Sequence, residues 1–184
     1  IKKNFIKKEP SIDRNMLDEA ISRLELAERP IIYSGGGVIN SGQSAVNSLR
    51  NLVAGTNFPI TSTLMGLGSY PASGKNWLGM LGMHGTYEAN MSMHDCDFML
   101  CIGARFDDRI TGRIDAFSPN SYKVHLDIDP SSINKNITVD APLIGDVSQI
   151  LSMLIARWKE RGSKVNKKKL TAWWKSINLS LIHI

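Results

Sequence analysis

The sequence has only two cysteines, Cys96 and Cys101, among its 184 residues. Two thiols cannot build a disulfide framework, and they cannot supply a zinc site of the usual kind. Cys101 lies within an apolar run, where a cysteine behaves as a small buried hydrophobe. Such sparse cysteine use is typical of a reducing compartment, so we expect a cytoplasmic setting.

Long hydrophobic runs are also absent, so the sequence predicts no membrane span. The chain begins Ile1-Lys-Lys-Asn-Phe5, with neither an initiator Met nor an apolar signal core, and we expect its natural start to lie further upstream. The net charge is +5, with basic residues concentrated near both ends. Because no aromatic residues are spaced among them for base stacking, a solvated linker is favoured over a nucleic-acid site.

Catalytic and metal-binding constellations are missing as well. We find no Ser-His-Asp or Cys-His arrangement and no His/Cys cluster with metal-ligand spacing. The sequence therefore predicts neither a catalytic residue nor a metal site within this chain. Trp173-Trp174 is interpreted as a packing anchor.

What is present is an alternation of short apolar runs with amphipathic segments, which is typical of βαβ units. Apolar spacing predicts helices over residues 13–28, 43–54, 86–94, 147–161 and 167–178. Strands are predicted at residues 31–33, 59–62, 97–102, 122–126 and, as a short fifth, 136–139. The stretch from Leu64 to Gly85 is so rich in glycine that we expect no regular structure there. The predicted fold is α/β, a doubly wound parallel sheet of about six strands with helices on both faces.

The most informative motif is Gly103-Ala-Arg-Phe-Asp-Asp-Arg109, which directly follows the apolar run 98–102. Open α/β sheets bind ligands at the carboxyl ends of their strands. Four charged residues directly after a strand would lie at the rim of a ligand crevice. They are Arg105, Asp107, Asp108 and Arg109. A self-neutralising loop of two Arg and two Asp remains an equally good interpretation of the spacing.

Ser34-Gly-Gly-Gly37 lies between a predicted strand and a helix. Glycines there let a phosphate approach backbone amides at a helix N-terminus, although a simple tight turn is the alternative. Gly42 is followed by Gln43-Ser44, so the phosphate-binding Lys of a P-loop is absent. This excludes the usual NTPase motif.

Two aspartates close later segments. Asp127, in Asp127-Ile-Asp-Pro130, can accept ribose hydroxyls or can form an Asp-Pro turn with a helix cap. Asp146 precedes a predicted helix, where it can act as an N-cap or can face adenosine. His84, in Met83-His-Gly85, is a lone histidine, for which a structural role is more common than a catalytic one.

Five ordered segments together resemble the large, catalytic subunit of acetolactate synthase, a thiamine-diphosphate enzyme. They are Arg29-Pro-Ile-Ile-Tyr-Ser-Gly-Gly-Gly37, Thr61-Ser-Thr-Leu-Met-Gly-Leu-Gly68, Leu81-Gly-Met-His-Gly-Thr-Tyr-Glu-Ala-Asn90, Gly103-Ala-Arg-Phe-Asp-Asp-Arg-Ile-Thr-Gly112 and Leu126-Asp-Ile-Asp-Pro130. The resemblance runs from about residue 13 to about residue 178 and corresponds to the middle of three domains. It implies that this domain binds FAD, without a net redox role, and lines the active-site channel.

The resemblance also assigns residues. It implies that FAD is bound by Gly35, Gly36, Gly37, Thr63, Leu64, Met83, His84, Gly85, Gly103, Ala104, Arg105, Asp107, Arg109, Asp127, Ile128 and Asp146. Asp108 and Arg109 match positions of the substrate channel, where herbicidal inhibitors bind in this family. Thiamine diphosphate and Mg²⁺ would be held by the other two domains, so this chain alone should not turn over pyruvate.

For the whole enzyme the resemblance implies condensation of two pyruvates, or of pyruvate with 2-oxobutyrate, with release of CO₂, in branched-chain amino-acid biosynthesis. The implied partners are a second catalytic subunit in a dimer or tetramer, a small regulatory subunit and small 2-oxo acids. Alternatives are a pyruvate oxidase or glyoxylate carboligase type of enzyme, or a nucleotide-binding module without catalysis.

The same resemblance implies domain boundaries. We expect residues 1–12 to be a linker from an N-terminal domain and residues 13–162 to be the FAD-binding domain. Residues 163–178 would be a linker or helix toward a C-terminal domain. The ending Leu179-Ser-Leu-Ile-His-Ile184 departs from the family pattern, and we expect it to be a sequencing-adapter artefact.

Overall fold

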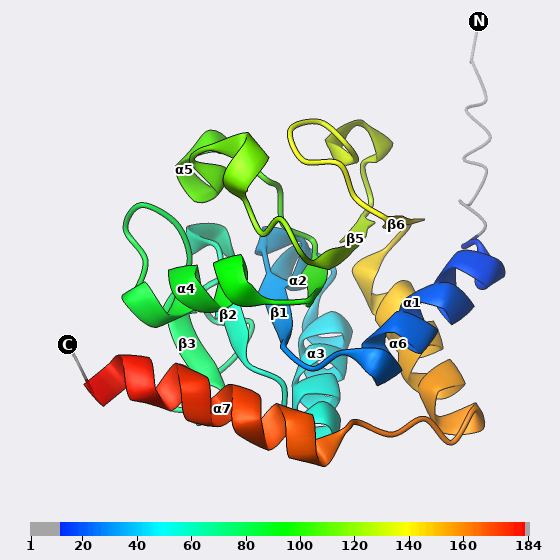
Figure 1. Cartoon of the computed structure of the whole chain (residues 1–184). Helices are drawn as coiled ribbons and strands as arrows, with labels where there is room; N and C mark the ends of the chain where they lie inside the picture. The colour runs from blue at the N-terminus through cyan, green and yellow to red at the C-terminus, as the bar shows by residue number, and fades with distance from the viewer. Residues whose placement is uncertain (1–11, 183–184) are drawn as a thin grey trace, which may run out of the picture.

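The computed structural model describes residues 12–182, which form a parallel sheet covered by helices (Figure 1). The strands are β1 (Pro30–Ser34), β2 (Ile60–Ser62), β3 (Trp77–Met80), β4 (Phe98–Ile102), β5 (Tyr122–Asp127) and β6 (Ala141–Ile144). The α-helices are α1 (Arg14–Leu26), α2 (Gly36–Asn40), α3 (Gln43–Thr56), α4 (Tyr87–Asp95), α5 (Asp108–Thr111), α6 (Val147–Glu160) and α7 (Lys167–Ile182). Short 3₁₀ turns are η1 (Leu64–Gly66), η2 (Ile114–Ala116) and η3 (Pro130–Ser132). The expected linker at residues 1–12 lies almost wholly outside the described residues.

The sheet has the order β3-β2-β1-β4-β5-β6, and every neighbouring pair is parallel. The strand order reverses between β1 and β4, so β1 to β2 and β3 to β4 cross over in opposite directions. Right-handed crossovers in opposite directions place α3 and α4 on opposite faces of the sheet. All residues of β1 and β4 are buried, as is typical of strands covered on both sides. The predicted doubly wound parallel sheet of six strands is confirmed.

The prediction of irregular structure throughout residues 64–85 is wrong, because Trp77–Met80 forms edge strand β3. The backbone of Ile60 and Ser62 in β2 provides a ladder to which this segment pairs. The glycine-rich composition is accommodated by an irregular register and by Gly79, whose φ is +92°. Glycine thus shortens and distorts this strand without preventing it.

The predicted fifth strand at residues 136–139 is also wrong. The backbone N–H of Val139 donates to the side chain of Asn134 at 2.8 Å, so it is not free to join a ladder. Pairing with β5 begins only at Ala141, and β6 contains Pro142. A proline is tolerated there because β6 is an edge strand, with one side of its backbone unpaired.

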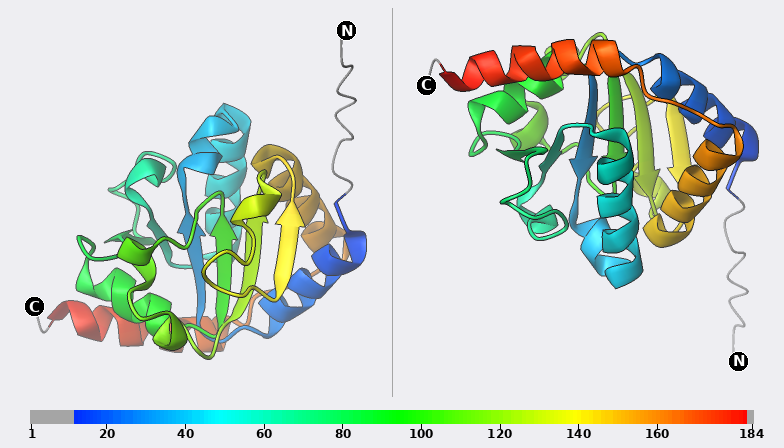
Figure 2. Two further views of the ribbon diagram at one scale, coloured as in Figure 1. Left: turned by 90° about the horizontal axis from the view of Figure 1, so that it is seen from above. Right: turned by 90° about the horizontal axis from the view of Figure 1, so that it is seen from below.

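Helix α7 closes the end of the sheet at which the strands begin. Figure 2 shows it running across the amino-terminal ends of the strands. Trp173 is buried, and its Nε1 donates to the carbonyl of Pro30 at 3.1 Å. Trp174 Nε1 donates to the carbonyl of Asn57 at 2.8 Å. The interpretation of this tryptophan pair as a packing anchor is confirmed, and the helix continues through residue 182.

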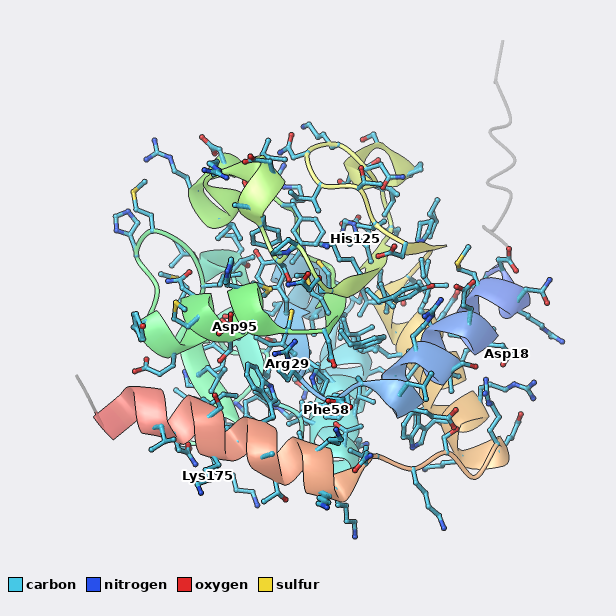
Figure 3. All side chains as sticks on the ribbon, in the orientation of Figure 1. Asp18, Arg29, Phe58, Asp95, His125 and Lys175 are labelled. Carbon is cyan, nitrogen blue, oxygen red and sulfur yellow. The ribbon has the colours of Figure 1, made fainter. Side chains whose placement is uncertain are left out.

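An ion-pair network joins α1 to α6. Asp18 accepts two hydrogen bonds from the guanidinium of Arg157, at 2.7 and 3.0 Å. Arg161 donates to the backbone carbonyl of Asp18 at 2.9 Å. The hydrogen bond from Arg157 holds the pKa of Asp18 below its usual value. Figure 3 labels Asp18 at this helix pair, which lies beside β6 and away from the strand ends described next.

Candidate functional site

A cleft of about 850 Å³ lies at the carboxyl ends of the central strands, where the strand order reverses. Its walls come from segments that follow β1, β2, β4 and β5. The lining residues are Gly36, Gly37, Ile39, Asn40, Thr63, Leu64, Met65, Gly103, Ala104, Arg105, Asp107, Asp108, Arg109, Ile110, Asp127, Ile128, Asp129, Ser132 and Asn136. The reversal point of an open α/β sheet is where ligands bind.

The glycines after β1 have a second role that sequence reasoning missed. A Cβ on Gly35 would lie 2.2 Å from the carbonyl oxygen of Gly103, and a Cβ on Gly37 would lie 2.6 Å from the Cα of Gly103. The segment after β1 therefore packs directly on the backbone of the segment after β4. Hydrogen bonds from Gly35 N to Ile102 O and from Gly37 N to Gly103 O, both 2.9 Å, hold this contact.

The charged residues after β4 form close pairs yet stay accessible. Arg105 Nη2 lies 2.9 Å from Asp107 Oδ2, and these side chains are 63% and 43% exposed. Arg109 and Asp108 are more loosely placed, at 4.0 Å. Exposed pairs of this kind contribute little to folding. Both arginines are thus paired locally and also exposed at the cleft.

Most of the residues predicted to bind FAD come together at this cleft, but five do not line it. Asp146 accepts from the backbone N–H of Ser148 at 2.9 Å and of Gln149 at 3.3 Å, so it is the N-cap of α6. Gly35 lies beneath the lining. The other three are Met83, His84 and Gly85.

The loop that carries Met83 nevertheless adjoins α5. Met83 N donates to the carbonyl of Arg109 at 3.0 Å, and Arg109 Nη1 lies 3.8 Å from Met83 Sδ. The side chain of Asn90 bonds both the N–H and the carbonyl of Gly82, each at 3.0 Å, and so secures the start of this loop. Met83 and His84 are both exposed.

Sequence reasoning did not identify several lining residues. They are Ile39, Asn40, Met65, Ile110, Asp129, Ser132 and Asn136. Leu64, Met65 and Ile128 are each at least 66% exposed, so the cleft presents several large apolar side chains to solvent. Met65, Ile110 and Asp129 lie inside segments already recognised in the sequence, and that position was the signal available for them.

Asp127 ends β5 and is nearly buried. Its Oδ1 accepts from the backbone N–H of Asp129 at 2.9 Å, and its Oδ2 lies 3.8 Å from His125 Nε2. Asp129 in turn caps the turn η3 through Ser131. The turn interpretation therefore holds for this segment, while Asp127 still lines the cleft.

His125, labelled in Figure 3, is fully buried in β5. Its Nε2 donates to the carbonyl of Ala104 at 2.8 Å, and its Nδ1 has no hydrogen-bond partner among residues 12–182. Burial lowers the pKa of His125, and the bond to Ala104 and the charge of Asp127 only partly oppose this. The folded chain therefore keeps this imidazole neutral at a pH where an unfolded chain would protonate it.

A pH dependence of stability follows from this burial. Below an unfolded-state pKa of about 6.5, the unfolded chain binds a proton that the folded chain does not, so stability falls as the pH falls. We expect His125→Gln to lose less stability than the unchanged chain between pH 7.5 and pH 5, because its amide does not titrate. Urea unfolding at several pH values measures this, and parallel stability curves for the two chains would contradict it.

Within residues 12–182, no group of three or more His, Cys, Asp or Glu side chains is placed to hold a metal ion. The same part of the chain contains no helix with the length and apolar character needed to cross a bilayer.

Comparison with known proteins gives consistent results. The family described as thiamine pyrophosphate enzyme, central domain, matches residues 17–154. The isozyme 3 large subunit of acetolactate synthase from Escherichia coli (strain K12) is 40% identical over 89% of this chain and 28% of its own length. The large subunit from Haemophilus influenzae is 42% identical over 90% of this chain and 28% of its own length. An acetolactate synthase from Mycobacterium bovis is 39% identical over 87% of this chain and 25% of its own length.

These findings confirm the resemblance carried by the five motifs. The chain spans about a quarter of the length of these relatives. It belongs to the thiamine pyrophosphate enzyme family and corresponds to the central domain of that family.

Proposed function

We propose that this chain is the FAD-binding central domain of an acetolactate synthase large subunit and that its cleft also lines the substrate channel. The observation that carries the proposal is the order of chemical groups along the carboxyl edge of the sheet. Exposed Leu64 and Met65 follow β2, and Gly36 and Gly37 follow β1. Arg105 follows β4, Asp127 ends β5, and Ile128 comes directly after it.

This order suits an extended dinucleotide. Neighbouring strands are ~4.8 Å apart, and three such spacings separate β2 from β5, so the segments after these strands are about 14 Å apart. An extended dinucleotide can reach across this distance. Apolar side chains at one end suit the flavin ring, arginine near the middle suits the diphosphate, and Asp127 with Ile128 suits the adenosine. FAD bound here would supply structural support without net redox chemistry.

The activity of the whole protein is part of the same proposal. Thiamine diphosphate and Mg²⁺ would be held by other domains, where two pyruvates, or pyruvate and 2-oxobutyrate, would be joined with release of CO₂. A second catalytic subunit and a small regulatory subunit would complete a cytoplasmic bacterial enzyme. The names of the relatives favour this over an oxidase, a glyoxylate carboligase or a module without catalysis. Assay of the full-length protein for acetolactate formation from pyruvate tests it.

Arg105→Ala tests the cofactor site directly. A charge-assisted hydrogen bond is worth about 1.5–3 kcal/mol, so we expect FAD to bind the variant about 10- to 100-fold more weakly. The measurement is a fluorescence titration of the 184-residue chain, with NAD as the competing dinucleotide.

The matched control is Arg113→Ala. Arg113 is also exposed and also paired, with Asp115 at 2.8 Å, but it does not line the cleft. We expect it to leave FAD affinity unchanged. The proposal is wrong if the unchanged chain unfolds cooperatively, and so is folded, yet shows no saturable FAD binding.

A further inference from the structure

Three consecutive backbone carbonyls after β4 are each bonded by a side chain from elsewhere in the fold. His125 Nε2 donates to Ala104 O at 2.8 Å. Tyr33 Oη donates to Arg105 O at 3.4 Å, and Asn136 Nδ2 donates to Phe106 O at 2.7 Å. These donors lie on β5, on β1 and in the loop before β6, so the segment is held from three directions.

The side chain at the centre of this segment is fixed as well. Phe106 is only 5% exposed. Its ring centroid lies 5.1 Å from that of His125, 5.7 Å from that of Phe117 and 6.0 Å from that of Tyr33. Packing and hydrogen bonding therefore hold the same short stretch, and Arg105, immediately before Phe106, points out of it into the cleft.

The direction of the carbonyls matters for an anionic ligand. A carbonyl oxygen that accepts from a buried donor is not free to turn toward a diphosphate, which it would repel. With these three carbonyls bonded to the protein, the segment offers the cleft the guanidinium of Arg105, 63% exposed, rather than backbone oxygens.

We propose that Tyr33 and Asn136 are positioning residues for the dinucleotide, acting through the backbone on which Arg105 is carried. This inference rests on the proposed function of the cleft. Tyr33 is the sharper of the two to test, because it is fully buried and cannot touch a ligand itself. Asn136 also lines the cleft, so its substitution alone would not separate a direct contact from a positioning role.

The test is a double-mutant cycle between Tyr33→Phe and Arg105→Ala, read by FAD affinity. We expect Tyr33→Phe to weaken binding about 3- to 10-fold when Arg105 is present and to have almost no effect in the Arg105→Ala chain. The matched control is Tyr122→Phe, which also loses one hydroxyl hydrogen bond, to Glu19 at 2.8 Å, at the amino-terminal end of β5 and away from the cleft. An equal loss in both Arg105 backgrounds, or no loss in either, would overturn the proposal.

Amide hydrogen exchange of the ligand-free chain provides the second readout. We expect residues 104–107 to exchange faster in Tyr33→Phe and in Asn136→Asp, which keeps the size of the side chain but loses the N–H donor. Tyr122→Phe should leave these residues unchanged. If the unchanged chain binds FAD but residues 104–107 exchange at the same rate in the variants, the positioning role alone is overturned. If the unchanged chain is folded and does not bind FAD, the proposed function is overturned together with the positioning role.

Discussion

Gly35→Ala is expected to destabilise the folded chain by about 3 kcal/mol, toward the upper end for overpacked interiors. The added Cβ would lie 2.2 Å from Gly103 O and 2.5 Å from Ala104 Cα, both backbone atoms that no rotamer change can move. The backbone of Gly35 has φ −124° and ψ −174°, which alanine adopts freely, so the expected loss comes from space and not from backbone strain. Urea unfolding followed by circular dichroism measures it.

Gly55→Ala is the matched control and should act in the opposite direction. Gly55 lies within α3, and a Cβ there would meet nothing within 4 Å. Gly55 is in the last turn of α3, and alanine is favoured over glycine within a helix by up to about 1 kcal/mol, so this variant should be more stable than the unchanged chain. Equal stability of Gly35→Ala and the unchanged chain would show that the segments after β1 and β4 do not pack as closely as described.

Trp173→Ala is expected to cost about 3–5 kcal/mol, the range for removing a large buried aromatic side chain. Trp173 is 5% exposed, and its indole covers the start of β1 while donating to the carbonyl of Pro30. Trp173→Phe should lose less stability, about 1–3 kcal/mol, because a buried aromatic ring is still present but the carbonyl of Pro30 loses its hydrogen-bond donor. Denaturant midpoints of the three chains give the comparison.

Lys168→Ala serves as the control on the same helix, because Lys168 is exposed and should change stability by less than about 0.5 kcal/mol. The result also bears on the domain boundary. A large loss for Trp173→Ala would make residues 167–178 part of this folding unit. An unchanged midpoint would instead favour the expectation that this segment is a linker toward a further domain.

Much of the site was predictable because its signals are local. The apolar run 98–102 is followed by Gly103 and Arg105, and the next predicted strand is followed by the turn that begins at Asp127. Both motifs are therefore expected at one edge of a parallel sheet. Longer helices with clear apolar spacing, such as α3 and α6, were predicted to within two residues, whereas the short helices α2 and α5 were not predicted. Strand β3 was missed because its pairing with β2, not its own composition, stabilises it.

The sequence by itself determined the fold class, the family and most of the residues that meet at the cleft, since strand-ending motifs and their order are written along the chain. The tertiary structure alone decided what those residues touch. Only packing against Gly103 shows why Gly35 must lack a side chain, and only the start of α6 shows Asp146 as a cap. Asn136 reaches Phe106 across 30 positions, and Trp173 reaches Pro30 across 143. Contacts over such separations depend on how the whole chain closes on itself, and no local pattern encodes them.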